Sequence, residues 1–484
     1  MNLSVCCGER EELKAEVVVV GGGPAGIQAT RMLKERRPDL EVAVLRPEPH
    51  SMVYCALPYA MEGLFPLERT FKKDELVTGV GARLIRQRAI SLDLESRSLL
   101  LEDGRTLRFG KLLIATGAIP LRPGFPGSDL GNVLTVKTAA DAESIMARLP
   151  RVDDCAEGER GAVPEAGVRA VVVGSGAIGI EQAIAYRARG VEVHLVEMRD
   201  HVLPHLLDSD MTRDLEERLQ EMGVELHLST SLEGLEGDGE AERVRLSGGR
   251  EIELERGRDF AVLAMGMAPD IEVFAAAGLE VVADGLVVDE RMRTSASGVW
   301  AAGDCVAFLS GIDGKALGGK LATNAVPMAK VAARDMLEME ASYRGFFNGA
   351  ATVVGDLRAA GTGFTEAFAR SRGLEVFSTH GATSTRFPMM PGAGDVRVKL
   401  VFEVGSGRLV GAQAVGAEAV AERIDLCTFA IQKGADAFEL AELSYAAQPW
   451  QTFFPARNAI VEAASAAGDV LEGSGKAEGG REVR

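Results

Sequence analysis

The chain has 484 residues, more than one hydrophobic core usually serves, so two or three domains are expected. Apolar residues make up 46% and glycine contributes 56 residues, which is typical of a large α/β enzyme and excludes a disordered chain. The 53 Lys and Arg against 71 Asp and Glu give a formal charge of -18, which argues against a nucleic-acid partner.

No apolar run approaches the roughly 20 residues needed to cross a bilayer. Residues 1–16 lack the apolar core of a secretory signal, so a cytoplasmic protein without a membrane span is expected. Because the cysteines are few and scattered, no disulfide framework is expected; they are Cys6, Cys7, Cys55, Cys155, Cys305 and Cys427. No Cys-x-x-Cys pair or His/Cys cluster indicates a metal, and none is expected.

An apolar run over residues 17–20 leads into a glycine-rich sequence, residues 21–26, and then a helical stretch over residues 27–36. The run predicts a strand buried in a parallel sheet. Strand, tight turn and helix N-terminus are what a dinucleotide pyrophosphate needs, because glycines let the backbone approach and the helix start favours negative charge. The glycines of this first loop are Gly21, Gly23 and Gly26.

The next predicted strand, residues 42–45, ends where an acidic residue would normally bind the adenosine ribose. Here that position is Arg46. Glu48 or backbone groups can replace the acid, or the ribose can be held in another way, and the sequence leaves these alternatives open. Arg46 therefore enters the set of candidate cofactor-binding residues by its position.

Cys55 follows within ten residues, in the sequence Ser-Met-Val-Tyr-Cys-Ala-Leu-Pro-Tyr. Pro58 suits the first turn of a helix, where its missing N–H would have no partner. Such a helix would direct backbone amides towards Cys55 and favour the thiolate. Ser51 would lie one turn before it, on the same face if the segment is helical. A lone cysteine is more often a packing residue, so the surrounding motifs decide.

Residues 83–110 have the pattern of short strands, with a hairpin turn at Asp103 and Gly104. The sequence Ala-Thr-Gly then contributes Thr116 and Gly117. A helix is predicted over residues 139–149, and the Asp, Glu, Gly and Pro content of the segment after it indicates a linker or insertion.

The first pattern then repeats as an apolar run over residues 170–173, a second glycine loop and a helix over residues 181–189. The loop glycines are Gly174, Gly176 and Gly179. The strand over residues 193–196 ends at Glu197, where the ribose-binding acid belongs. Because a carboxylate accepts bonds from a free 2'-hydroxyl and repels a 2'-phosphate, Glu197 predicts NADH in preference to NADPH.

A later strand closes on a Gly-Asp turn, and Asp304 there suits polyol hydroxyls; a turn Asp that caps the next helix is the alternative. A helix is predicted from about residue 320 to 339. Strands over residues 396–402 and 409–415 are expected to pair, with helices after them. The polar segment from residue 468 to the end predicts a disordered tail.

The two loops, the Ala-Thr-Gly sequence between them, the turn at Asp304 and the C-terminal α+β region together resemble the flavoprotein oxidoreductases with two dinucleotide domains. The Ser-x-x-x-Cys-x-Leu-Pro-Tyr sequence resembles their single-cysteine branch, which contains coenzyme A disulfide reductases, persulfide reductases, NADH oxidases and NADH peroxidases. The fold that this implies is α/β, with two Rossmann-like domains for FAD and NAD and a C-terminal α+β dimerisation domain. The implied boundaries are a leader (1–15), an FAD-binding domain (16–150 and 285–345), a linker or insertion (151–168), an NAD-binding domain (169–284), the dimerisation domain (346–466) and a disordered tail (467–484).

By this resemblance the first loop binds FAD together with Thr116, Gly117 and Asp304, and the second loop binds NADH with Glu197. Cys55 becomes the redox centre and Ser51 its neighbour. Tyr445, supplied by the second subunit of a homodimer, is the expected proton donor to the leaving thiolate, and an aromatic interface residue is the alternative interpretation.

The implied activity is NADH-dependent reduction of a small disulfide, persulfide or polysulfide, with coenzyme A as a possible carrier, through attack by Cys55. Arg386, Arg457, Lys72 and Lys73 are candidates for holding a phosphorylated thiol. The reductases carry a tyrosine pair where this chain has Met389 and Met390.

Three alternatives remain open. The oxidases and peroxidases of this branch resemble one another in a histidine within the FAD loop. In this chain no histidine precedes His50, so an NADH oxidase or peroxidase is disfavoured. The other two are a flavoprotein that reduces a small redox protein and a redox-sensing flavoprotein with negligible turnover.

Overall fold

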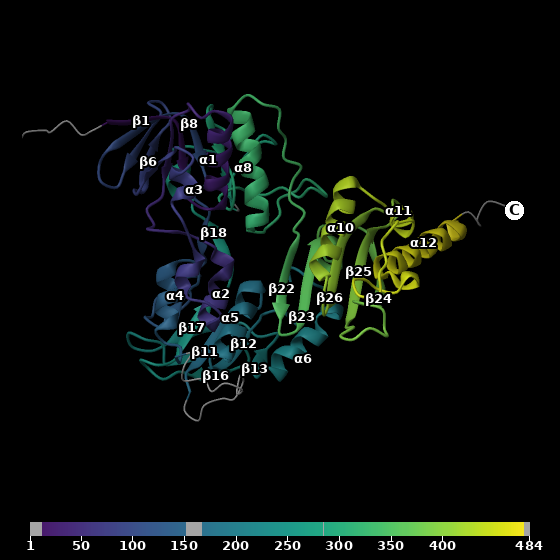
Figure 1. Ribbon diagram of the computed structural model, residues 1–484. Coiled ribbons are helices and arrows are strands. Elements are labelled where there is room, and N and C mark those ends of the chain that lie inside the picture. The colour runs from purple at the N-terminus through teal and green to yellow at the C-terminus, as the bar shows by residue number, and fades with distance from the viewer. Residues whose placement is uncertain (1–11, 152–166, 284, 479–484) are drawn as a thin grey trace, which may run out of the picture. The chain divides into compact units, whose positions relative to one another are not determined.

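The computed structural model describes residues 12–151, 167–283 and 285–478 (Figure 1). The chain divides into two compact units. The first unit comprises Met1–Tyr54, Leu67–Ile119 and Gly266–Phe346, and the second comprises Cys55–Pro66, Pro120–Met265 and Phe347–Arg484.

The first unit is built on a seven-stranded sheet in the order β5-β2-β1-β8-β7-β6, with β21 also paired to β8. β1 runs parallel to β2 and β8, and the predicted hairpin at Gly104 is confirmed by the antiparallel pair β7 and β8. Helices α1 and α8 pack together. The elements of the first unit have the bounds β1 Glu12–Val20, β2 Val42–Leu45, β5 Arg83–Ile85, β6 Ala89–Asp93, β7 Ser98–Leu101, β8 Thr106–Ile114, β21 Val299–Ala301, α1 Pro24–Arg36, α3 Glu75–Thr78, α7 Glu272–Ala276 and α8 Ala322–Met336.

A five-stranded parallel sheet in the order β10-β17-β11-β12-β13 starts the second unit. Its apolar residues form one core with those of an antiparallel sheet of β14, β15 and β16. This core includes Val171, Val173 and Ala261 from the parallel sheet and Val244 from the antiparallel one. The bounds are β10 Val133–Leu134, β11 Arg169–Val173, β12 Glu192–Val196, β13 Val224–His227, β14 Leu232–Glu236, β15 Arg243–Leu246, β16 Arg250–Glu253, β17 Phe260–Leu263, α2 Leu57–Glu62, α4 Ala139–Met146, α5 Ala177–Ala188 and α6 Arg213–Glu221.

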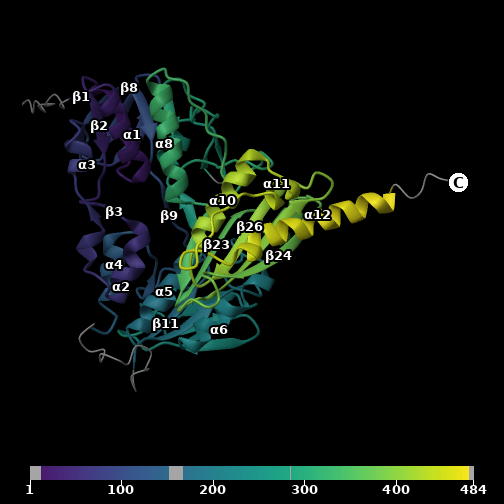
Figure 2. The ribbon, with the colours of Figure 1, turned by 45° about the vertical axis from the view of Figure 1, so that its right-hand side comes forward.

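The C-terminal part of the second unit is an antiparallel sheet in the order β22-β23-β26-β25-β24 (Figure 2). β25 and β26 pair as predicted, with Val398 opposite Ala414. Helix α10 packs on β23 and β26, and α12 packs on β24 and β25. The bounds are β22 Ala350–Val354, β23 Leu357–Gly363, β24 Val376–Ser384, β25 Asp395–Glu403, β26 Leu409–Gly416, α9 Glu366–Ser371, α10 Val420–Lys433, α11 Ala437–Ala441 and α12 Ala459–Glu478.

The predicted disordered tail is wrong over most of its length, because α12 continues to Glu478. Ala463, Ala464 and Ala467 are fully buried, so small side chains let the helix sit close to the sheet. A Cβ on Gly381 would lie 2.0 Å from the carbonyl oxygen of Ala459, which shows how close this packing is. Neither α12 nor any other helix in the described ranges is long and apolar enough to cross a membrane.

Candidate active site

The first glycine loop joins β1 to α1 and is tightly packed on its inner side. Gly21 has φ +117°, and a Cβ there would lie 2.0 Å from the carbonyl oxygen of Ala115. A Cβ on Gly26 would lie 1.9 Å from the carbonyl oxygen of Gly21, whereas Gly23 has no atom within 4 Å of its Cβ position. Only glycine fits at the inner positions, and the outer side leaves room for a phosphate group.

The second loop, between β11 and α5, repeats this arrangement. Gly174 has φ +105°, and a Cβ there would lie 2.5 Å from the carbonyl oxygen of Ala264. A Cβ on Gly179 would lie 1.8 Å from the carbonyl oxygen of Gly174, and Gly176 has no atom within 4 Å of its Cβ position. Each unit therefore carries one loop with the geometry that a dinucleotide needs.

Glu197 lies at the end of β12 and contacts the second loop directly. Its Oε2 accepts hydrogen bonds from the backbone N–H of Ser175 at 2.9 Å and from the Ser175 hydroxyl at 2.8 Å. Its Oε1 accepts from the backbone N–H of Arg199 at 2.8 Å. The carboxylate predicted to recognise the ribose is thus fixed in orientation beside the loop.

The Arg46 side chain packs against the first loop at Gly22. Its side chain is 2% exposed, and its guanidinium lies 2.6 Å from Asp74 and donates to the carbonyl oxygens of Glu48 and Pro49. A Cβ on Gly22 would lie 2.5 Å from the Arg46 Cδ. Burial alone would raise the pKa of Asp74, but the Arg46 and Arg86 guanidinium groups outweigh it and leave that pKa lowered. The Arg46 guanidinium therefore binds Asp74 and backbone carbonyl oxygens of its own chain, whereas the Glu48 side chain is exposed.

The other residues predicted for FAD gather around the first loop. The Thr116 hydroxyl donates to the carbonyl oxygen of Asp270 at 2.6 Å, and Gly117 has no atom within 4 Å of its Cβ position. A Cβ on Gly303 would lie 3.2 Å from the Ala25 Cβ, so the turn that carries Asp304 packs against the start of α1.

The first unit also contains a buried polar atom that fits a bound cofactor. Ser51 is 2% exposed, and its hydroxyl has no hydrogen-bond partner among the described residues. The segment is not helical at Ser51, so the condition under which Ser51 would share a helical face with Cys55 is not met: Ser51–Met52 form strand β3, which pairs with β4, Phe71–Lys72. Together with the open sides of Gly23 and Gly117, this hydroxyl makes the unit fit a polar, phosphate-bearing group such as FAD.

Cys55 lies in a 3-10 turn, Tyr54–Ala56, directly before α2. Pro58 occupies the first turn of α2, as predicted. Cys55 is exposed, whereas Cys305 and Cys427 are buried, and burial raises their pKa values to about 11 and about 12. Of the cysteines in the described ranges, Cys55 is therefore the accessible thiol; Cys6, Cys7 and Cys155 lie outside those ranges.

A tyrosine one helical turn after Cys55 and the glutamate that pairs with this tyrosine were not identified from the sequence. The Tyr59 hydroxyl on α2 donates to the Glu181 carboxylate on α5, and Glu181 also accepts from the Thr352 hydroxyl at 3.1 Å. Burial raises the Tyr59 pKa to about 12, and the charges of Glu181 and Cys55 add to this. Burial also raises the Glu181 pKa. The available signal was that Tyr59 follows Cys55 by one helical turn and Glu181 follows the second glycine loop.

Tyr445 is 40% exposed and lies in an irregular segment after α11. Its hydroxyl donates to the carbonyl oxygen of Pro455 at 2.6 Å, and its ring centroid lies 5.6 Å from that of Phe453. These contacts are within its own chain and do not include Cys55.

The arginines considered for a phosphorylated thiol have carboxylate partners. Arg386 lies 3.1 Å from Glu418, and Arg457 lies 3.1 Å from Glu462. Arg457 lines a hollow of about 960 Å³ in the second unit, whose other arginines, Arg218 and Arg397, are also paired with carboxylates. The lining of this hollow holds five carboxylate residues against three arginines, so it has no excess positive charge to hold a phosphorylated thiol, and Cys55 is not part of it.

The fold and the site define the class of oxidoreductases with two dinucleotide-binding domains. The features that define it are two glycine loops on parallel sheets, an exposed cysteine before a short helix and a C-terminal antiparallel sheet. Residues 15–329 match the family described as pyridine nucleotide-disulphide oxidoreductase, and residues 350–453 match its dimerisation domain. The chain belongs to the pyridine nucleotide-disulphide oxidoreductase family. It is an oxidoreductase that uses FAD and NAD(P)H, which confirms the predicted fold class and the predicted use of FAD with a nicotinamide dinucleotide, while the preference for NADH over NADPH stays a prediction.

Relatives match along nearly the whole chain. A protein of Methanocaldococcus jannaschii named NADH oxidase is 31% identical over 448 residues, which cover 89% of this chain and 94% of the relative. A Pyrococcus horikoshii protein named NAD(P)H coenzyme A polysulfide/persulfide reductase is 30% identical over 451 residues, which cover 90% and 95%. The solved structure of an NAD-dependent persulfide reductase from A. fulgidus superposes with a TM-score of 0.85 at 30% identity and covers 95% of this chain and 84% of that one.

Proposed function

We propose that this protein is a homodimeric, NADH-dependent reductase of small disulfides or persulfides that acts through Cys55. The observation that carries the proposal is the state of the thiols. Cys55 is exposed at the start of α2 beside the Tyr59–Glu181 pair, whereas Cys305 and Cys427 are buried. An accessible thiol is what disulfide exchange requires.

The chemistry follows from thiol–disulfide exchange. The Cys55 Sγ attacks one sulfur of the substrate R–S–S–R', a Cys55–S–S–R bond forms, and R'–S⁻ leaves. Tyr445 of the second subunit is proposed to give this thiolate its proton. When bound, FAD and NADH would supply two electrons, with which the Cys55 thiolate is restored and the second thiol is released. The overall balance is RSSR' + NADH + H⁺ to RSH + R'SH + NAD⁺.

The cofactor-binding residues are proposed from their positions around the loops. For FAD they are Gly21, Gly23, Gly26, Arg46 as a support, Ser51, Thr116, Gly117 and Asp304; for NADH they are Gly174, Gly176, Gly179 and Glu197. Because Arg46 is committed to Asp74 and to backbone oxygens, the alternatives of Glu48 or backbone groups for the FAD ribose gain support.

Coenzyme A disulfide and coenzyme A persulfide are the proposed substrates, and the name of the P. horikoshii relative supports this choice. The name of the M. jannaschii relative supports an NADH oxidase as the second candidate. Against the oxidase, the first loop leads into α1 with Pro24, and no histidine precedes His50 in the sequence.

The test is a steady-state assay of FAD-loaded protein with NADH and, in turn, coenzyme A disulfide, coenzyme A persulfide, polysulfide, hydrogen peroxide and oxygen. We expect the highest kcat/KM with a coenzyme A substrate and a loss of at least about 1000-fold in Cys55→Ser, because the attacking sulfur is removed. Cys155→Ser is the matched control and should keep full activity. Mass spectrometry should show a mixed disulfide on Cys55. Oxygen as the best acceptor would favour the oxidase, and undiminished disulfide reduction by Cys55→Ser would exclude the proposal.

A further inference from the structure

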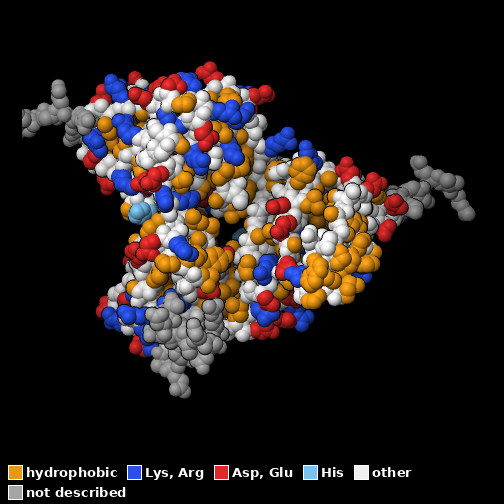
Figure 3. Space-filling model, viewed as in Figure 1, with side chains coloured by type: hydrophobic (Ala, Val, Ile, Leu, Met, Phe, Trp, Pro, Cys, Tyr) orange, Lys and Arg blue, Asp and Glu red, His pale blue; other side chains and the backbone are white. Residues whose placement is uncertain are grey.

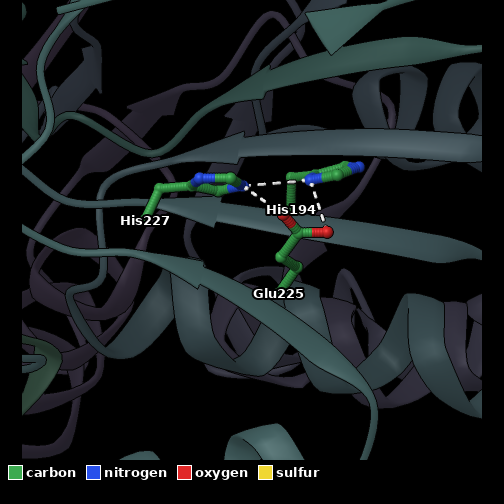
Figure 4. A group of neighbouring side chains, drawn as sticks. All are labelled: His194, Glu225 and His227. Carbon is green, nitrogen blue, oxygen red and sulfur yellow. Dashed lines mark hydrogen bonds and ion pairs between the residues drawn. The ribbon is translucent and has the colours of Figure 1, made fainter. Parts of the chain in front are cut away.

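We propose that His194, Glu225 and His227, on the edge of the parallel sheet of the second unit, bind a divalent transition-metal ion of the zinc type (Figure 4). These three residues lie outside the nucleotide loops and the Cys55 region, and metal binding there is independent of the proposed function.

The spacing of the three donor atoms fits a tetrahedral ion. His194 Nδ1 lies 3.0 Å from His227 Nε2 and 3.4 Å from Glu225 Oε2, and His227 Nε2 lies 3.4 Å from Glu225 Oε1. Ligands bound to zinc at about 2.0–2.2 Å are separated by roughly 3.3–3.6 Å in a tetrahedron, so both contacts of Glu225 match, and the two histidine nitrogens would move apart by about 0.3 Å. Two imidazoles and one carboxylate are also a donor set that zinc accepts in proteins.

The backbone places these side chains on one face of the sheet. His194 on β12 lies opposite Glu225 on β13, and Val196 lies opposite His227. Because alternate residues of a strand point the same way, His194, Glu225 and His227 project together. The sequence carries the pattern twice, as Glu-Val-His ending at His194 and Glu-Leu-His ending at His227.

A further carboxylate orients His194 as a ligand. His194 Nε2 lies 3.1 Å from Glu192 Oε1, and Arg169 holds the Glu192 carboxylate with bonds of 2.8 and 3.1 Å. An acceptor at Nε2 keeps the proton there and leaves the lone pair of Nδ1 directed at the proposed metal position, an arrangement typical of metal-bound histidine.

Burial favours a site that is fixed at the histidines and open at the carboxylate. The side chains of His194 and His227 are 9% and 12% exposed, whereas Glu225 is 62% exposed. The neutral imidazole is the form of histidine that binds a metal ion. The exposed side of Glu225 leaves a fourth position for water.

Zinc binding by calorimetry on the full-length, FAD-loaded protein tests the proposal. Because thiolates also bind zinc, the parent protein carries serine at Cys6, Cys7, Cys55 and Cys155, and chelator removes metal before titration with zinc chloride. We expect one zinc per chain, no binding at this site in His227→Ala, and affinity lowered roughly 10- to 100-fold in Glu192→Gln, which acts through His194.

Two variants make the outcome decisive. Glu225→Gln changes an exposed side chain, so it tests the site even if a histidine variant fails to fold, and it should weaken zinc binding at least about 10-fold. His380→Ala removes another histidine that pairs with a carboxylate, Asp210 at 2.9 Å, and should bind zinc like the parent. Zinc should raise the Tm of the parent and of His380→Ala but not of His227→Ala. Two outcomes would show that the cluster is only a hydrogen-bonded histidine pair. One is no zinc binding by the parent, and the other is zinc affinity in Glu225→Gln and His227→Ala equal to that of the parent.

Discussion

At the residue scale, Glu181 holds a carboxyl group in surroundings that disfavour its charge. Burial raises its pKa above the ordinary 4.5, while the hydrogen bonds from Thr352 and Tyr59 favour the ionised form and limit the rise. The folded protein therefore binds this proton more tightly than the unfolded chain does. The stability that this contributes is complete below about pH 4.5 and is lost as pH rises through the folded pKa.

Glu181→Gln should remove this pH dependence. We expect the free energy of unfolding of the variant to gain on that of the wild type between pH 5 and pH 8, because glutamine pays no penalty for ionisation in the folded state. Urea unfolding at the two pH values measures the difference. Thr352→Val is the companion variant: it removes a bond that favours the carboxylate, so its stability should fall more steeply with pH than that of the wild type. A constant difference between wild type and Glu181→Gln would contradict the raised pKa.

Glu197→Ala should change coenzyme preference. The carboxylate is already oriented by Ser175 and Arg199, so its loss removes a fixed charged acceptor for the ribose 2'-hydroxyl. We expect kcat/KM with NADH to fall about 10- to 100-fold, since hydrogen bonds to charged groups contribute roughly 1.5–3 kcal/mol. The ratio of NADH to NADPH efficiency should fall with it. Glu233→Ala, on β14 and exposed, is the control that should leave both unchanged, and an unaltered ratio in Glu197→Ala would argue against ribose recognition there.

At the element scale, one buried lysine ties residues 208–211 to the C-terminal sheet. Lys399 on β25 is 4% exposed and lies 3.2 Å from Asp208, 2.9 Å from Asp210 and 3.1 Å from Glu366. Asp208 also accepts the backbone N–H groups of Glu366 and Ala367 at the start of α9. Burial alone would raise the Asp208 pKa, but these donors and Lys399 outweigh it and leave that pKa lowered. This charged cluster holds three elements of the second unit in register.

Lys399→Met should destabilise the protein by about 3–5 kcal/mol, because it leaves buried carboxylates without their cation. Urea unfolding monitored by far-UV circular dichroism gives the value. Arg397→Met on the same strand is the matched control, since Arg397 makes one exposed ion pair with Asp214 at 2.7 Å and should cost at most about 1 kcal/mol. Equal losses in the two variants would mean that burial of Lys399 has no special effect.

At the scale of the whole molecule, the C-terminal region exposes large apolar side chains, as expected of a dimerisation domain (Figure 3). They are Leu426 and Phe429 on α10, Phe438 on α11, and Tyr445, Trp450 and Phe454 in the segment after it. Tyr445 therefore lies among residues suited to meet a second subunit, which is where the proposed mechanism uses it.

Subunit mixing tests whether Tyr445 serves the Cys55 of the second subunit. Tyr445→Phe should lower kcat, and Cys55→Ser should remove activity. A heterodimer that pairs a Tyr445→Phe subunit with a Cys55→Ser subunit contains one site with both native residues, so we expect about half the wild-type activity per dimer. Co-expression with two affinity tags isolates this heterodimer. A Tyr445→Phe homodimer with full turnover would show that Tyr445 is an interface residue only.

The sequence by itself determined the repeated strand, glycine loop and helix, because inner positions of such loops admit only glycine and leave a pattern that can be read along the chain. It also determined that a helix with Pro58 in its first turn follows Cys55, and that β25 pairs with β26, since these features depend on neighbouring residues or on a strand period of two. The tertiary structure alone decided the features made by residues far apart in the chain. It bonded Tyr59 to Glu181, gathered three carboxylates around Lys399, brought His194 and His227 together from adjacent strands, and continued α12 through a tail whose composition predicted disorder. Burial supplies the physical reason in each case, because it changes what charged, polar and small side chains contribute, and burial depends on packing partners that local sequence does not contain.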